Sequence, residues 1–191
     1  MEDKLHNMEK KKIKLEERIS IPEGVSIEIS GDGHLIKASM NGKKTEKNFV
    51  LHKVKIKKQG NEIIVSAENT RREDKKIAGA IVAHIKKIFQ GLNEDYVYKL
   101  EICNVHFPMN VKIEADKLVI KNFLGEKLPR IAKIISGANV EIKGNIIEVV
   151  SHDKDAAGLT VSNIELATKI KNRDRRVFQD GIFLTEKPRR R

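Results

Sequence analysis

The sequence predicts an α+β fold of two tandem duplicated domains, each a small antiparallel sheet with one packed helix. The frame apolar-Pro-x-x-Val-x-Ile-Glu occurs twice, as IPEGVSIE at residues 21–28 and as FPMNVKIE at residues 107–114. After each copy come strand-like apolar runs, a Gly-Asn pair (residues 60–61 and 144–145) and a segment with helical periodicity, in the same order. A pattern repeated in this way is typical of a duplicated unit.

The strands are predicted from alternating apolar residues. Val25, Ile27 and Ile29 in the first copy, and Val111 and Ile113 in the second, follow the period of two expected for a strand with one buried face. The Gly-Asn pairs supply the positive-φ residues that a tight hairpin needs. Both copies are therefore expected to begin with an antiparallel sheet.

Each copy is expected to close with a helix. In the first copy, Thr70 and Glu73 form a capping box, and Gly91 ends the helical run. Its apolar face consists of Ile77, Ile81, Ile85 and Ile88. In the second copy, Asp153 or Asp155 can cap the helix. Its apolar face consists of Val161, Ile164, Ala167 and Ile170.

These signals divide the chain into four expected parts. Residues 1–19 form a charged N-terminal extension, 20–103 a first α+β domain, 104–184 a second α+β domain and 185–191 a basic C-terminal tail. Hydrophobic residues make up 39% of the 191 residues and charged residues 34%, which favours folded domains over disorder or a membrane protein. The single cysteine, Cys103, fits a reducing compartment, and the expected location is cytosolic.

The net charge indicates a polyanionic partner. A formal charge of +11 favours nucleic acid first and an anionic membrane second. Aromatic residues make up 4% and there is no Trp, so stacking surfaces for unpaired bases are scarce. If the partner is RNA, structured backbone is the expected target.

Common catalytic and ligand-binding motifs are missing from the sequence. No two of the twelve glycines are three or five positions apart, which excludes the dinucleotide fingerprint, the P-loop and the GxxG loop. Cys103 and His106 have a ligand-like spacing, but there is no second cysteine pair, so no metal is expected. Ser151-His152-Asp153 is better explained as a strand end and helix cap than as a catalytic triad. Neither enzymatic activity nor a cofactor is predicted.

The excess positive charge of the second half lies in its last segment. Residues 169–191 hold nine Lys or Arg and three acidic residues, whereas residues 107–168 hold eight of each sign. Val177, Phe178, Ile182 and Phe183 flank an Asp-Gly turn and are expected to anchor the segment before them. Lys187 to Arg191 is then a loose basic end, and a merely solvated tail is the alternative.

The sequence resembles the archaeal and eukaryotic branch of ribosomal protein six of the large subunit. The similarity covers about residues 19 to 187, and its most specific segments are HFPMNVKIEADKLVIKNFLGEKLPRIAKI at 106–134 and SNIELATKIKNRDRRVFQDGIF at 162–183. The resemblance implies two duplicated α+β domains and no catalysis. It also implies binding of large-subunit ribosomal RNA, mainly by the second domain, near the sarcin–ricin loop and the base of the factor-binding stalk.

The resemblance also implies which residues contact RNA. They are Lys121, Asn122, Lys127 and Arg130 on a turn of the second domain, Asn163 at the start of its helix, and Lys169, Lys171, Asn172, Arg173, Arg175 and Arg176 before the Asp-Gly turn. The basic end adds Lys187, Arg189, Arg190 and Arg191. For each of these residues, a solvated surface position is the competing interpretation.

The sequence therefore predicts a structural constituent of the large ribosomal subunit. Its expected partners are large-subunit ribosomal RNA, neighbouring ribosomal proteins near the stalk base and, by proximity, translation factors; a membrane is not expected. The alternatives are a stand-alone regulator that binds structured RNA and a small enzyme acting on RNA or a charged metabolite. A contact by the first domain through Arg71, Arg72, Lys75 and Lys76 stays open.

Overall fold

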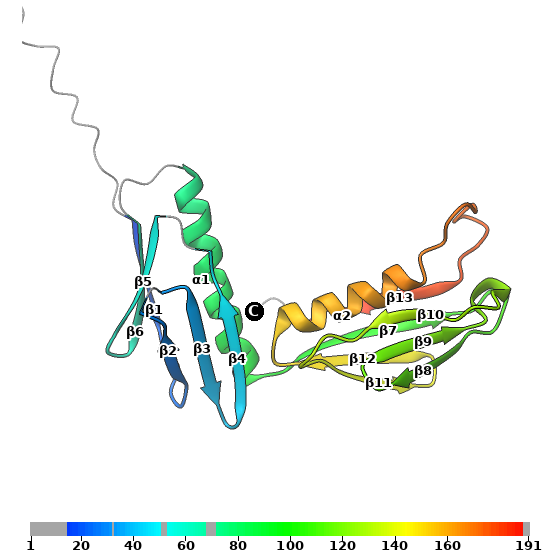
Figure 1. The fold of residues 1–191 in the computed structure, drawn as a ribbon, viewed down its shortest axis with the longest axis horizontal. Coiled ribbons are helices and arrows are strands. Elements are labelled where there is room, and N and C mark those ends of the chain that lie inside the picture. Colours follow the sequence, from blue (N-terminus) through cyan, green and yellow to red (C-terminus); the bar gives the residue numbers. More distant parts are fainter. Residues whose placement is uncertain (1–14, 32, 51–52, 68–71, 189–191) are drawn as a thin grey trace, which may run out of the picture. The chain divides into compact units, whose positions relative to one another are not determined.

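The computed structural model describes residues 15–31, 33–50, 53–67 and 72–188. The chain divides into two compact units, residues 1–89 and 90–191. The α+β class and the repeated order of elements are both confirmed (Figure 1). Thr70, Arg71 and Arg189 to Arg191 lie outside the described residues, so the expected capping box and the end of the basic tail are not described.

The first unit is built from two antiparallel sheets and a helix. One sheet has the strand order β2-β3-β4 and the other β1-β6-β5. The elements are β1 (Leu15–Ser20), β2 (Ser26–Ile29), β3 (Leu35–Met40), β4 (Lys43–Asn48), β5 (Val54–Gln59), β6 (Glu62–Ala67) and α1 (Arg72–Asn93). Helix α1 buries Ile81, Ile85 and Ile88 as expected, while Ile77 is half-buried.

The second unit repeats this arrangement and extends it. Its sheets have the orders β10-β9-β8 and β11-β12-β7-β13. The elements are β7 (Tyr96–Cys103), β8 (Asn110–Glu114), β9 (Lys117–Lys121), the 3-10 turn η1 (Phe123–Gly125), β10 (Arg130–Lys133), β11 (Asn139–Lys143), β12 (Ile146–Ser151), α2 (Lys154–Ala167) and β13 (Gly181–Glu186). Each unit thus contains two small sheets rather than one.

The core of the second unit lies between α2 and its sheets. Leu100 and Ile147 from the larger sheet, Ile120 from the smaller sheet and Ile164 from α2 have no exposed surface. Burying side chains of this size contributes about 1.5–3 kcal/mol each. Because Val161 and Ile164 share one helical face, their burial fixes the orientation of α2 and the place where the chain leaves it.

Most local signals in the sequence have the expected outcome. Gly60 and Gly144 have φ of 59° and 61° in the β5–β6 and β11–β12 hairpins. Asp153 caps α2, since its carboxylate accepts a hydrogen bond of 2.9 Å from the Asp155 amide. The expected buried face of β8 is wrong at Ile113, which is 40% exposed, because β8 is the edge strand of its sheet.

The expected domain boundaries differ from the compact units. Strand β7 pairs with β12 and β13, so residues 96–103 belong to the second unit and the division expected after residue 103 is too late. Residues 15–19 of the expected extension form part of β1, which pairs with β6. Strand β13 continues to Glu186, past the expected start of the tail at residue 185.

Gly91 does not end α1, contrary to expectation. The helix continues to Asn93, and Gly91 is buried. A Cβ atom at this position would overlap the carbonyl oxygen of His152 and lie 2.9 Å from the ring of Tyr96. Glycine is therefore required here for close backbone packing rather than for a helix stop.

Candidate nucleic-acid interface

The chain between α2 and β13, residues 168–180, carries five Lys or Arg residues and is called the basic loop below. It leaves the end of α2 and returns to the sheet as β13 (Figure 1). Lys171, Arg173, Arg175 and Arg176 are all exposed. The structure therefore brings these four predicted residues together on one loop, available to an anionic partner.

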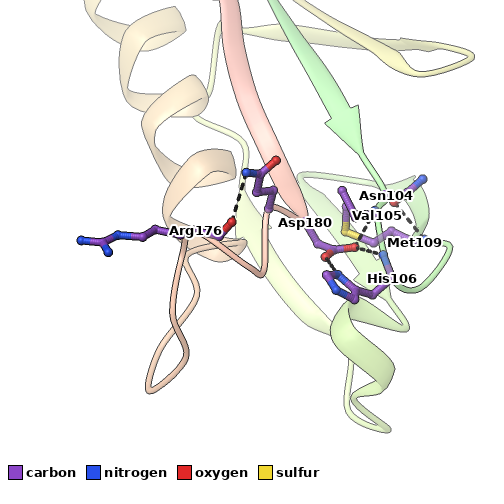
Figure 2. A network of polar contacts seen from close by, with 7 residues as sticks. Asn104, Val105, His106, Met109, Arg176 and Asp180 are labelled. Atoms are coloured by element: carbon purple, nitrogen blue, oxygen red, sulfur yellow. Dashed lines mark hydrogen bonds and ion pairs between the residues drawn. The ribbon is translucent and has the colours of Figure 1, made fainter.

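The basic loop has internal order. Asp174 accepts a hydrogen bond of 2.9 Å from the Arg176 amide through Oδ1, and its carbonyl oxygen accepts hydrogen bonds from the amides of Val177 and Phe178. Gln179 Nε2 donates to the carbonyl oxygen of Arg176 (Figure 2). Asn172 takes a left-handed conformation with φ of 58°, which Asn tolerates better than most residues. These contacts hold the cations in a defined turn.

Asp180 fixes the return of the basic loop to the sheet. Its side chain is 1% exposed, and Oδ1 accepts hydrogen bonds of 2.8 Å from the amides of Val105 and His106. His106 Nδ1 donates to Oδ2 at 2.6 Å (Figure 2). Burial alone would raise the pKa of Asp180, but these hydrogen bonds outweigh it and lower the pKa to about 2. The carboxylate thus joins the basic loop to the segment after β7.

Ring contacts of Phe178 also join the basic loop to the segment after β7. The ring of His106 stacks on Phe178 with a centroid distance of 4.9 Å and an interplanar angle of 30°. The guanidinium carbon of Arg173 lies 4.8 Å from the centroid of the same ring. A cation in this position is attracted by the aromatic ring, so Arg173 is oriented as well as exposed.

The expected apolar anchor of the basic loop is only partly correct. Ile182 is 1% exposed and lies in the core, but Val177 is 60% exposed and Phe183 is 42% exposed. Asp180 and Gly181 do not form a turn, because Gly181 begins β13. The buried carboxylate of Asp180, together with Ile182, does the anchoring that the sequence analysis assigned to four apolar residues.

Arg130 has a structural position. Its Nε and Nη2 donate to the two carboxylate oxygens of Glu126 at 2.8 and 2.6 Å, and Nη1 donates to the carbonyl oxygens of Ala167 and Lys169. The hydrogen bonds from Arg130 lower the pKa of Glu126. The guanidinium also lies 4.2 Å from the centroid of Phe123. Arg130 holds the end of α2, and these contacts occupy four of its five N–H donors.

The other predicted residues are either exposed or engaged in internal contacts. Lys121 and Lys127 are exposed. Asn122 has φ of 62°, and its Nδ2 donates to the carbonyl oxygen of Pro108 at 3.0 Å. Asn163 lies ten residues after Asp153, the N-cap of α2, and is therefore not at the start of the helix. Its Nδ2 donates to the carbonyl oxygen of Lys133. The side chains of Lys169 and Lys187 are exposed.

Residues considered for other chemistry have structural roles. Ser151 donates to the carbonyl oxygen of Gly137 and accepts from the amide of Asp153, so it ends β12 and leads into the cap of α2. Cys103 is half-buried at the end of β7, where burial raises the pKa of its thiol. Within the described residues, no three His, Cys, Asp or Glu side chains gather as a metal site, and no helix is long and apolar enough to cross a membrane.

Sequence reasoning missed Asp180 and His106 as positioning residues. In the sequence, His106 stands out only for its spacing from Cys103, and Asp180 is expected in an Asp-Gly turn. Their positions differ by 74 residues, and a pairing between such distant residues leaves no local pattern. The available signal was an acidic residue inside a strongly basic segment.

A two-unit α+β scaffold with an exposed, ordered and cation-rich loop defines a class of protein suited to polyanion binding. The family model for ribosomal protein L6 matches residues 107–181. The chain is 43% identical over 169 residues to large ribosomal subunit protein uL6 of Methanosarcina mazei, covering 88% of this chain and 95% of that protein.

Further relatives agree. The chain is 40% identical to the uL6 protein of Aeropyrum pernix, over 93% of this chain and 97% of that protein. It is also 40% identical to that of Methanobrevibacter smithii, over 91% and 96%. The chain belongs to the ribosomal protein L6 family. Members of this family are structural components and not enzymes, as the sequence predicted.

Proposed function

We propose that the chain is a structural constituent of the large ribosomal subunit that binds ribosomal RNA through phosphate contacts of the second unit. The single observation that carries this proposal is the basic loop. Its cations are exposed, and the buried carboxylate of Asp180 fixes the loop to the segment after β7. An ordered loop loses less conformational freedom on binding than a free tail, so more of its electrostatic attraction remains as affinity.

We propose Lys171, Arg175 and Arg176 as the main phosphate contacts. All three are exposed, and arginine presents a planar fork that matches phosphate oxygens. Lys121, Lys127 and Lys169 add exposed charge on the same unit. Six such contacts would give a slope of log K against log[salt] on the order of −4 to −5. Arg130 is proposed as a structural residue instead.

The proposed location follows from the family resemblance. We infer that the second unit lies near the sarcin–ricin loop and the base of the factor-binding stalk, in the cytoplasm as part of the ribosome. Neighbouring ribosomal proteins and translation factors would then be partners by proximity. The relatives are named large ribosomal subunit protein uL6, and this supports the proposal that the chain is part of the large ribosomal subunit.

Sedimentation in high salt tests this proposal against the stand-alone regulator. The tagged full-length chain is expressed in its host, and the lysate is separated on a sucrose gradient in high salt. A structural constituent is expected to stay with the large particle. Recovery of the chain in the soluble fraction, with the particle intact, would favour the regulator.

A further inference from the structure

A groove lies beside the basic loop in the second unit. Its volume of 720 Å³ falls within the roughly 300–1,000 Å³ of small-molecule pockets. The end of α2, the edge strand β13 and the basic loop surround it. Its apolar lining consists of Val105, Leu166, Ile170, Phe178, Ile182 and Phe183.

Three apolar side chains of this groove are exposed. Val105 is 61% exposed, Leu166 60% and Phe183 42%. Gly181 leaves room for the ring of Phe183 to fold back along β13, because a Cβ atom at Gly181 would lie 2.8 Å from Cζ of that ring. The groove therefore offers an aromatic and aliphatic surface that the described part of the chain leaves exposed.

The charged groups at the groove favour an anionic occupant. Lys169 and Arg175 line it and have exposed side chains. Its acidic residue, Glu165, is already engaged, because Oε1 accepts a hydrogen bond of 3.0 Å from the Leu184 amide. Thr168 Oγ1 accepts a hydrogen bond from the Ile182 amide in the same way. The groove thus combines an apolar wall with two available cations.

We propose that this groove receives one unpaired base extruded from the bound RNA. The base packs against Phe183 and Leu166, while its flanking phosphates meet Lys169 and Arg175. A nucleotide has this combination of a flat, weakly polar ring and an anionic phosphate, and aromatic side chains stack on bases of any sequence. The inference rests on the proposed function and revises, at this one place, the expectation that RNA is bound through backbone alone.

The test uses the full-length chain and deproteinised large-subunit ribosomal RNA. Ultraviolet irradiation joins bases to side chains in direct contact, and mass spectrometry then locates the nucleotide adduct. Phe183→Ala is compared with Ile146→Ala, a matched control: both residues are 42% exposed, and both lie opposite Glu101 of β7. The adduct is sought in the unaltered chain, so that part of the test does not depend on a variant folding.

We expect an adduct on Phe178 or Phe183, and a loss of affinity of roughly 5- to 100-fold for Phe183→Ala with an unchanged salt slope. Ile146→Ala is expected to change affinity less than about twofold. The base site would be overturned if RNA binding depends on salt but no adduct forms in the groove and both variants bind RNA with the same affinity. The proposed function would remain intact, and the groove would then suit an apolar segment of a neighbouring protein. Absence of RNA binding would overturn both.

Discussion

The two units share one scaffold, and the second adds to it. The sheets β2-β3-β4 and β1-β6-β5 of the first unit correspond in order to β8-β9-β10 and β7-β12-β11 of the second, and α1 corresponds to α2. After α1 the chain continues directly into β7. After α2 it forms the basic loop and returns as β13, which pairs with the other edge of β7.

This difference separates the scaffold from the proposed binding surface. The outer edge of the added strand β13 is partly covered by Glu165 of α2 and by Thr168, the C-cap of that helix. Thr168 accepts a hydrogen bond from the Ile182 amide, and Glu165 accepts one from the Leu184 amide. Covering an edge in this way protects it from pairing with another chain. The repeated elements therefore supply a stable base, and the addition supplies the exposed cations.

The largest expected effect concerns two glycines of α1, one in each unit. Gly91→Ala should lower the free energy of unfolding of the second unit by about 3 kcal/mol, because the new Cβ overlaps the carbonyl oxygen of His152. Gly79→Ala should instead stabilise by about 0.5–1 kcal/mol, since nothing lies within 4 Å of its Cβ position. Urea denaturation with peptide-resolved hydrogen exchange measures both. Equal effects would contradict the close packing at Gly91.

Asp180→Ala tests whether the added segment depends on its buried carboxylate. We expect the second unit to lose about 3 kcal/mol, because the amides of Val105 and His106 lose their buried acceptor. Asp174→Ala is the control, since Asp174 is exposed and should cost at most about 1 kcal/mol. Hydrogen exchange should show the loss in residues 90–191 and leave the first unit unchanged. A similar loss in both units would refute the assignment.

Arg130 distinguishes a structural arginine from an RNA contact. Arg130→Ala should destabilise the second unit by about 2 kcal/mol, since it removes four hydrogen bonds. Arg130→Lys should cost nearly as much, because an ammonium group cannot replace the planar fork. Thermal unfolding measures the stability, and RNA titrations should show an unchanged salt slope. A reduced slope in Arg130→Lys, which keeps its charge, would contradict this role.

The acid dependence of the second unit provides a smaller effect. The pKa of Asp180 is about 2 when folded, below its ordinary value of 3.8. Its contribution is therefore fully present above about pH 4 and lost as the pH falls through 2, and it amounts to about 2 kcal/mol. The stability difference between the unaltered chain and Asp180→Ala should shrink over this window. A difference that stays constant from pH 5 to 2 would rule out this explanation.

The sequence was sufficient for the features that rest on local patterns. Alternating apolar residues predicted the strands, the Gly-Asn pairs predicted two hairpins, and Asp153 was recognised as a possible cap. These features depend on residues that are close in the chain, so their signals are contained in short segments.

Features formed by distant residues were not predictable in the same way. The hydrogen bonds from His106 to Asp180 and from Arg130 to the end of α2 join residues far apart in sequence. The assignment of β7 to the second unit likewise depends on its pairing with β12 and β13. A basic composition showed where charge accumulates, but the structure was needed to distinguish exposed Arg175 from internally bonded Arg130.

The central claim is that RNA binding resides in the basic loop of the second unit, and a salt titration tests it most directly. The loop variant Lys171→Gln/Arg175→Gln/Arg176→Gln is compared with the helix variant Lys75→Gln/Lys76→Gln/Lys86→Gln; each removes three exposed cations. Affinity for deproteinised large-subunit ribosomal RNA is measured across a range of salt concentrations. The slope of log K against log[salt] should become shallower by about 2 to 3 for the loop variant and stay unchanged for the helix variant. An equal change in both variants, or a larger one in the helix variant, would contradict the claim.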